Sequence, residues 1–255
     1  MFDSHTHILD DRLIEQSEQI VKDMKSDGVE YIVEIGACPD ESVMALEFAS
    51  RHDNVWATAG VHPLYADKYT DDFADWVKKN KDNEKLVAVG ECGLDFYHKR
   101  TTPELQREVF IKQIKLANEV GLPLVVHSRD ACLETYEILK DHKEYLNNGV
   151  LLHCFSYSAL EEEPYKTLDC YFAFGGAITT RNCDVAREAI LNAPLDRLLV
   201  ETDCPYLSPK PVKNEINQPK YIRHVIEHIA KILGKSSTEV EKITTENAKR
   251  FYRVG

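Results

Sequence analysis

Histidines and acidic residues follow several short apolar stretches of this chain. His5 and His7 are two residues apart, and on a β-strand this spacing places both side chains on the same face. Two imidazoles that point in one direction form a natural half of a metal site. A single histidine of this kind is usually a hydrogen-bonded core residue, but further ligand-type side chains follow other apolar stretches. They are His62, Glu91, His127, His153, Glu201 and Asp203.

This set of imidazoles and carboxylates predicts a catalytic site with two divalent metal ions (Mg²⁺, Mn²⁺ or Zn²⁺). Mixed nitrogen and oxygen donors suit Zn²⁺, Mn²⁺ or Fe²⁺, and Mg²⁺ or Mn²⁺ where carboxylates and water dominate. Six ligand side chains are more than one tetrahedral ion needs, which favours two ions that share a carboxylate. Glu91, on the fourth expected strand and between the other donors, is the expected shared ligand. The expected ligands are His5, His7, Glu91, His127, His153 and Asp203.

Eight apolar, β-rich runs alternate with amphipathic, helix-like segments. The runs are Phe2–His7, Tyr31–Gly36, Trp56–Val61, Leu86–Gly90, Leu122–His127, Gly149–His153, Tyr171–Gly175 and Leu198–Glu201. Nearly continuous apolar strands separated by helices indicate parallel pairing with both faces covered. Eight such units in about 250 residues are typical of a (β/α)8 TIM barrel, an α/β fold, and a doubly wound open sheet is the alternative. In a barrel the carboxyl ends of all strands meet at one face, so the donors would converge there.

One more helix is expected after the eighth unit, because Ser236 and Glu239 form a capping-box pattern. No linker rich in Gly, Ser or Pro divides the chain, so we expect residues 1–255 to form a single domain.

The composition limits the possible partners. The 255 residues include 31 Lys and Arg against 43 Asp and Glu, a formal net charge of −12. This excludes a protein that coats DNA or an anionic membrane by bulk charge, although bound cations can reverse the field at one site. No apolar run reaches the length of a membrane span, and no signal peptide is evident. Seven cysteines without a Cys-x-x-Cys pair favour a reducing compartment, so a cytoplasmic protein is expected.

Five motifs occur in the order found in one known family and together span nearly the whole chain. They are Asp3-Ser4-His5-Thr6-His7, Gly90-Glu91-Cys92-Gly93-Leu94-Asp95, Val126-His127-Ser128-Arg129, His153-Cys154-Phe155-Ser156 and Glu201-Thr202-Asp203-Cys204-Pro205-Tyr206-Leu207. In these motifs the chain resembles the TatD family, whose members are metal-dependent deoxyribonucleases built on an amidohydrolase-type barrel. The segment that contains Gln106, Phe110 and Gln113 is also similar to the family's helix after the fourth strand.

The resemblance implies a role for each matched side chain. One ion would be held by His5, His7 and Asp203. The other would be held by His127 and His153, with Glu91 between the two ions.

Three further residues have implied roles outside the ligand set. His62 and Arg129 would contact the phosphate of the substrate, and Glu201 would lie behind the ligands. The chain departs from the family pattern near the presumed substrate, with effects on substrate fit that the sequence leaves open. The departures are Tyr157, Lys213-Asn214 and Gln218.

These expectations give a hydrolytic mechanism centred on Glu91 and Asp203. Two cations would activate a shared hydroxide that attacks a phosphodiester, and Asp203 could accept the proton. With a net charge of −12, binding to DNA should be weak and confined to a few phosphates. A strand end enters a barrel mouth more easily than the interior of a duplex does. The sequence therefore predicts an exonuclease that prefers single-stranded DNA ends, and the resemblance to the TatD family implies digestion in the 3′-5′ direction.

Two alternative functions remain open at this point. One is an amidohydrolase or phosphotriesterase-like lactonase acting on a small molecule, but such sites often use a carboxylated lysine where this chain has Glu91. The other is a non-catalytic, metal-stabilised barrel, although open metal sites are usually catalytic. The physiological metal, the natural substrate and the oligomeric state are not determined by the sequence, and a monomer is compatible with it.

Overall fold

Eight parallel strands form the centre of the structure. In the computed structural model, which describes residues 1–180 and 184–255, each strand pairs with the next along the chain. The strands are β1 (Phe2–Thr6), β2 (Tyr31–Glu34), β3 (Val55–Ala59), β4 (Leu86–Asp95), β5 (Leu124–Arg129), β6 (Val150–Leu152), β7 (Tyr171–Phe174) and β8 (Leu198–Val200). Directly after β8, the amide of Asp203 donates to the carbonyl of His5, and the amide of His7 donates to the carbonyl of Cys204. These bonds bring the two ends of the sheet together into a nearly closed barrel.

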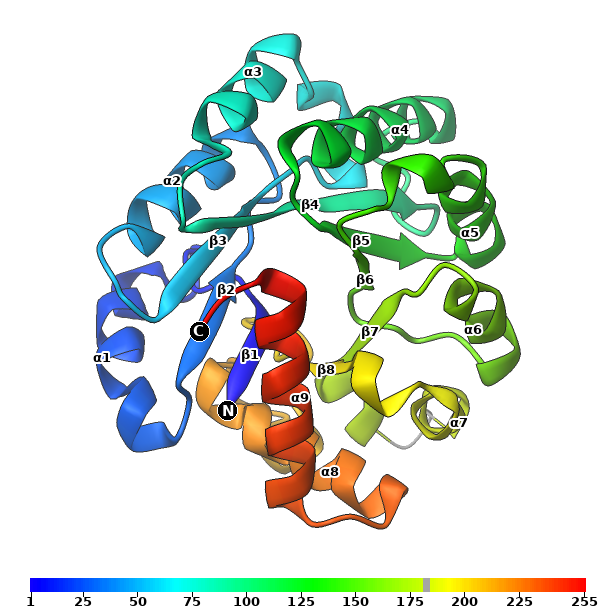
Figure 1. Ribbon diagram of the computed structural model, residues 1–255. Helices are drawn as coiled ribbons and strands as arrows, with labels where there is room; N and C mark the ends of the chain where they lie inside the picture. Colours follow the sequence, from blue (N-terminus) through cyan, green and yellow to red (C-terminus); the bar gives the residue numbers. More distant parts are fainter. Residues whose placement is uncertain (181–183) are drawn as a thin grey trace.

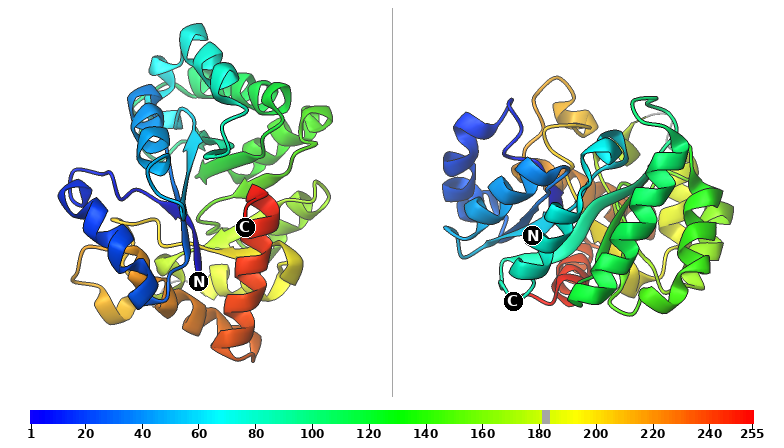
Figure 2. Two further views of the ribbon diagram at one scale, coloured as in Figure 1. Left: turned by 60° about the vertical axis from the view of Figure 1, so that its left-hand side comes forward. Right: turned by 90° about the horizontal axis from the view of Figure 1, so that it is seen from above.

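Helices cover the outside of this barrel. They are α1 (Ser17–Asp27), α2 (Pro39–Ala49), α3 (Asp71–Asn80), α4 (Pro103–Val120), α5 (Cys132–Asp141), α6 (Ala159–Lys166), α7 (Asp184–Asn192), α8 (Ile222–Leu233) and α9 (Ser237–Tyr252). Figure 1 shows the helices arranged around the strands, and Figure 2 gives two further views. The predicted (β/α)8 TIM barrel is confirmed, and the open sheet is excluded. Within the described ranges, no helix is long and apolar enough to cross a membrane.

The strands are buried on both faces, as their apolar sequences predict. Side chains such as Ile32 and Val89 pack between strands and helices, whereas Val33 and Leu199 pack on the other side. The largest difference from the predicted boundaries is in β4, which runs on to Asp95 instead of ending at Gly90. The polar residues after Gly90 are therefore part of a buried strand that continues to pair with β5.

The last helix, α9, lies against the amino ends of the strands. It begins with the predicted capping box, in which Ser236 and Glu239 bond to each other's backbone amides. Near its end, Phe251 and Tyr252 are buried, and the Tyr252 hydroxyl donates to the carbonyl of Ser4 at 2.8 Å. Figure 1 shows α9, in red, crossing the barrel beside the N-terminus. The opposite end of the barrel is left for the polar side chains.

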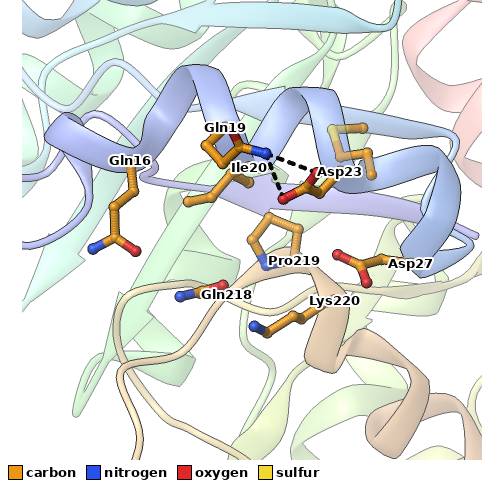
Figure 3. Close-up of a pocket in the computed structure, with 9 residues that line it drawn as sticks. Gln16, Gln19, Ile20, Asp23, Asp27, Gln218, Pro219 and Lys220 are labelled. Carbon is orange, nitrogen blue, oxygen red and sulfur yellow. Dashed lines mark hydrogen bonds between the residues drawn. The ribbon is translucent and has the colours of Figure 1, made fainter.

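A cavity of about 190 Å³ lies outside the barrel, between α1 and the segment before α8. Figure 3 shows its lining, in which Gln19 donates to Asp23 beside Gln218 and Lys220. None of the predicted metal ligands, which all belong to the described part of the chain, lines this cavity. Gln218, one of the departures from the family pattern, is therefore a wall residue of this outer cavity.

Candidate metal centre

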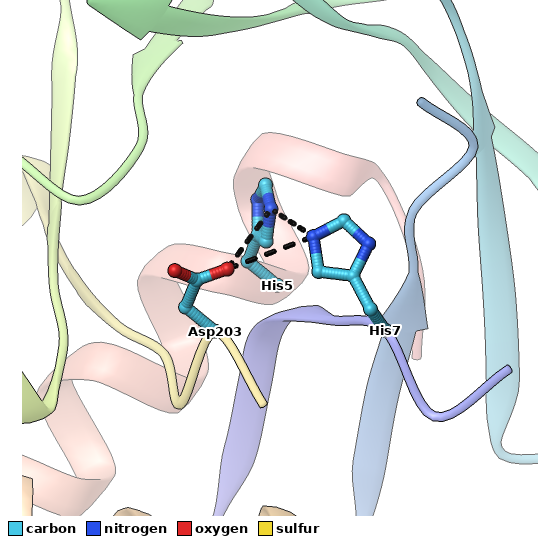
Figure 4. Close-up of side chains that lie close together, drawn as sticks. All are labelled: His5, His7 and Asp203. Atoms are coloured by element: carbon cyan, nitrogen blue, oxygen red, sulfur yellow. Dashed lines mark hydrogen bonds and ion pairs between the residues drawn. The ribbon is translucent and has the colours of Figure 1, made fainter. Parts of the chain in front are cut away.

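Three ligand-type side chains meet where the two ends of the sheet join. His5 is in β1, His7 directly follows β1, and Asp203 is in the loop after β8. The Nε2 atoms of His5 and His7 are 3.2 Å apart, and Asp203 Oδ1 lies 3.8 and 3.6 Å from them. Figure 4 shows the three side chains pointing toward one another. With bonds of about 2.1 Å, the ligands of a tetrahedral ion are about 3.4 Å apart, so this spacing fits a divalent ion.

The backbone after β8 turns sharply and directs Asp203 toward β1. Asp203 has a φ of 55°, which lies in the left-handed region that residues other than glycine rarely adopt. The Asp203 carbonyl accepts from the amide of Tyr206 at 2.9 Å. Just before it, the amide and hydroxyl of Thr202 donate to the carboxylate of Asp3, at 2.8 and 2.6 Å. These bonds hold the loop, and with it Asp203, against the strand that carries His5.

Glu91, in β4, is buried at the centre of the histidines. Its carboxylate oxygens lie within 4.0 Å of a ring nitrogen of each of His5, His7, His62, His127 and His153. Burial raises the pKa of Glu91, but the surrounding imidazoles lower it well below its usual value. A carboxylate that stays ionised among several nitrogen donors is suited to contact more than one cation.

Glu201 fixes the protonation of His153. Its Oε1 lies 3.0 Å from Nδ1 of His153 and also accepts from the amide of Cys154 at 2.8 Å. Since Nδ1 donates, Nε2 of the neutral ring presents a lone pair, and it faces Oε1 of Glu91 at 3.2 Å. Two acceptors at this distance need a cation or a proton between them. Without an ion a proton serves, because Glu201 and Glu91 raise the pKa of His153 well above 6.5 despite its burial.

His127 lies on the other side of Glu91, between two carboxylates. Its Nδ1 is 2.9 Å from Glu91 Oε1, and its Nε2 is 3.3 Å from Asp95 Oδ2. Burial raises the pKa of Asp95, but hydrogen bonds from His127 and His98 lower it below its usual range. Asp95 was missed as a site residue by the sequence reasoning. Its signal was the spacing from Glu91, because residues four apart on a strand point to the same face.

His62 is prepared to donate a hydrogen bond. Its Nδ1 accepts from the amide of Leu64 at 3.1 Å, so Nε2 carries the proton of the neutral ring. Burial and the neighbouring His127 lower the pKa of His62 to about 3, which keeps the ring neutral at pH 7. This Nε2 lies 3.6 Å from Glu91 Oε1. His62 is therefore suited to donate to an anion and poorly suited to bind a metal ion through Nε2.

The described residues contain three groups of donors whose ligand atoms lie close enough to hold an ion. They are His5, His7 and Asp203; His5, Glu91 and His153; and His62, Asp95 and His127. All six expected ligands thus lie in one cluster, but His127 is grouped with Asp95 and His62 instead of with His153. The close approach of acceptor atoms in the first two groups fits bound cations.

The other predicted residues lie around this cluster. Arg129, at the exposed end of β5, places its guanidinium carbon 4.2 Å from the centre of the Tyr97 ring. The Tyr157 hydroxyl lies 3.0 Å from Ser128 Oγ and accepts from the amide of Ala131, so it joins the loops after β5 and β6. Lys213-Asn214 is mostly exposed, and none of its atoms belongs to the donor groups described above.

Comparisons with known proteins agree with the fold. The family model described as "TatD related DNase" matches residues 2–253. The "Uncharacterized metal-dependent hydrolase YabD" of Bacillus subtilis is 37% identical over 254 residues, covering 100% of this chain and 99% of the relative. The "3'-5' ssDNA/RNA exonuclease TatD" of Pectobacterium parmentieri is 36% identical over 266 residues, covering 100% of both chains.

A solved structure supports the same relationship. The TatD homologue YjjV of Escherichia coli superposes with a TM-score of 0.93 at 25% identity, covering 100% of this chain and 98% of that one. Matches of this length leave no part of the barrel unaccounted for. The chain belongs to the TatD-related DNase family.

Proposed function

We propose that this protein is a divalent-metal-dependent exonuclease that removes nucleotides from the 3′ ends of single-stranded DNA or RNA. Membership of the TatD-related DNase family and the relatives named as 3′-5′ exonucleases support this proposal. The single observation that carries it is the arrangement around Glu91. There, Nε2 of His153 and Oε1 of Glu91 lie 3.2 Å apart at the carboxyl end of the barrel, a distance that needs a cation or a proton between them.

Two ions are proposed, and Glu91 would contact both. His5, His7 and Asp203 would hold the first ion, and His153 and His127 would complete the second. Ions at such a centre polarise a phosphate oxygen and make a bound water more acidic. For His127 to serve as a ligand, one ring nitrogen must turn from a carboxylate to the ion.

The remaining steps are assigned to side chains of the chain itself. His62 donates a hydrogen bond from Nε2 to a phosphate oxygen, because its Nδ1 accepts from the amide of Leu64. Asp203 accepts the proton of the attacking water, since its side chain is 13% exposed and so reachable by water. Glu201 keeps His153 in the orientation and protonation state that a ligand needs.

The charge and the cysteines support a modest nucleic-acid affinity and a reducing compartment. With a net charge of −12, attraction to DNA has to come from the vicinity of the metal centre. All six cysteines in the described part of the chain are free, which fits the cytoplasm.

Digestion of end-labelled oligonucleotides tests this function. Metal-stripped protein is given Mg²⁺, Mn²⁺ or Zn²⁺ in turn, with single-stranded DNA or RNA labelled at its 5′ end. The expected result is a ladder of shortened products that keep the label, with slower digestion of a blunt duplex and none in EDTA. No digestion with any ion, or loss of the label as the first product, would contradict the proposal. A lactone tested in parallel would be hydrolysed only under the alternative function.

A further inference from the structure

Two exposed tyrosines in the described part of the chain each lie against an arginine near the metal centre. Tyr97 follows β4, is 58% exposed, and has the guanidinium carbon of Arg129 at 4.2 Å from its ring centre. Tyr206 lies in the loop after β8 and is 45% exposed, and the guanidinium carbon of Arg12 lies 4.2 Å from the centre of its ring. Tyrosine side chains usually bury most of the ring, so these rings present apolar surface to solvent.

Both rings are connected to side chains of the donor cluster. Tyr97 packs edge-on against His98 at 4.8 Å, and His98 bonds to Asp95 at 2.9 Å. Tyr206 packs edge-on against His7, with ring centres 6.0 Å apart. Since the barrel order is β1 to β8, the β4–β5 side and the β8–β1 side lie on opposite flanks of the mouth. The metal centre therefore lies between the two tyrosines.

The orientation of Tyr206 is fixed by polar bonds. Its hydroxyl donates to Asp10 Oδ2 at 3.1 Å, and Arg12 bonds to both carboxylate oxygens of Asp10. The charge of Arg12 is thereby neutralised, while the ring remains nearly half exposed. A rigid aromatic face without net charge can stack on a base but adds little attraction for phosphate.

The Tyr97 side differs in charge. In the described part of the chain no carboxylate lies within 4 Å of the Arg129 guanidinium, and Lys99 and Arg100 follow in the same loop. A cavity of about 540 Å³ adjoins this loop; its lining includes Lys99 and Arg100 but also Asp67 and Asp95, and Arg100 lies over the Tyr65 ring. In a chain of net charge −12, an arginine without a carboxylate partner beside an exposed ring fits a nucleotide, which combines a base with a phosphate.

We propose that Tyr97 with Arg129, and Tyr206 with Arg12, are two base-stacking platforms that hold a single-stranded nucleic acid across the barrel mouth. This proposal rests on the proposed exonuclease function. The Tyr97 platform also binds backbone phosphate through Arg129, whereas the Tyr206 platform contributes stacking alone. A duplex cannot use either ring without unstacking its own bases, so the platforms account for the expected preference for single strands.

Fluorescence of 2-aminopurine tests the stacking directly, because the fluorescence of this base is quenched when it stacks. Mg²⁺-loaded protein is titrated with single-stranded oligonucleotides whose 3′-terminal linkages are phosphorothioates that resist hydrolysis. Each oligonucleotide carries 2-aminopurine at one of the positions nearest the 3′ end. The wild type is expected to quench at two separate positions. Tyr97→Ala should abolish quenching at one of them and Tyr206→Ala at the other.

Affinity provides the second readout. Each alanine variant should weaken binding about 5- to 100-fold, as expected for one lost base stack. Tyr97→Phe should bind and quench as the wild type does. Tyr206→Phe keeps the ring but loses the hydroxyl bond to Asp10, so it should lose much less affinity than Tyr206→Ala. Both results would separate stacking from a folding defect. Leu191→Ala, which removes an exposed apolar side chain from the end of α7, is the matched control and should change nothing. Raising the salt concentration should weaken the Arg129→Ala variant less than the wild type.

The outcomes separate this proposal from the proposed function. If the wild type digests single-stranded DNA but the alanine variants bind and quench like the wild type, the platforms are refuted and the function stands. If the phenylalanine variants lose as much affinity as the alanine variants, stacking is likewise refuted. If the wild type releases no nucleotide from any single strand, the proposed exonuclease function is refuted, whatever the binding experiments show.

Discussion

The two ends of the barrel are built from the same strands but have opposite chemistry. β1 contributes Phe2 to the amino end, where it packs against Tyr252 of α9, and His5 to the carboxyl end, where it faces His7. At the amino end, buried aromatic rings fill the space. At the carboxyl end, buried carboxylates and imidazoles stand 3 to 4 Å apart.

This difference separates stability from chemistry. Packed rings at the amino end stabilise the fold through burial of apolar surface. Crowded polar groups at the carboxyl end cost free energy on burial and shift one another's pKa, which is tolerated where it creates a site. Substitutions at the carboxyl end should therefore lower activity and metal binding, and substitutions at the amino end should lower the free energy of unfolding.

The largest expected effect is at Glu91. Glu91→Ala removes the carboxylate next to all the clustered imidazoles, so each of the two proposed ions would lose a ligand and exonuclease activity should fall about 10³-fold or more. Activity on labelled oligonucleotides and the metal content of the purified variant are the measurements. A melting temperature near that of the wild type serves as the control for folding. Wild-type activity in this variant would break the assignment of chemistry to this end.

The matched change at the amino end is Phe251→Ala. Phe251 is buried against Tyr171 and Tyr252, and its removal leaves a cavity, so the free energy of unfolding should fall by about 3 kcal/mol. Urea unfolding measures this loss. Metal stoichiometry and the affinity for the ions should remain those of the wild type. If Phe251→Ala lost a metal ion but kept its stability, metal binding would depend on the amino end as well, and the two ends would not have separate roles.

Much of the fold could be predicted because apolar runs and their spacing determine where parallel strands form. The donors were found for the same reason, since strand ends in a barrel converge. Asp95 was missed because Glu91 to Asp95 resemble a loop in composition, whereas in the structure Asp95 still pairs with Arg129 in β5. The grouping of His127 with Asp95 depends on side-chain rotation, which sequence spacing does not specify.

A smaller effect is expected at Glu201. Glu201→Gln keeps the shape of the side chain but weakens the bond that orients His153, so affinity for metal ions should fall about 10- to 100-fold. Competition with a chelator of known affinity measures this change. If Glu201→Ala has no larger effect than Glu201→Gln, the bond to His153 is not what supports the ion.

The smallest effect, for a change of one pH unit, is a pH dependence of metal binding at the carboxyl end. Burial lowers the pKa of His7, but Asp203 and Glu91 raise it to about 9. Below pH 9 the metal-free ring therefore carries a proton that must leave before Nε2 binds an ion. The affinity for the ion held by His5, His7 and Asp203 should rise about tenfold per pH unit between pH 6 and 8 and level off near pH 9. Competition with a chelator measures metal affinity across this pH range. An affinity that does not change with pH would contradict the displacement of a proton from His7.

The central claim is that the imidazoles and carboxylates at the carboxyl end of the barrel hold metal ions. Anomalous scattering from crystals grown with Mn²⁺ or Zn²⁺ tests it most directly. The account predicts one peak within bonding distance of His5, His7 and Asp203, and a second beside His153, with Glu91 in contact with both. Peaks only at other places on the protein, or a Glu91 carboxylate that touches no ion, would contradict it.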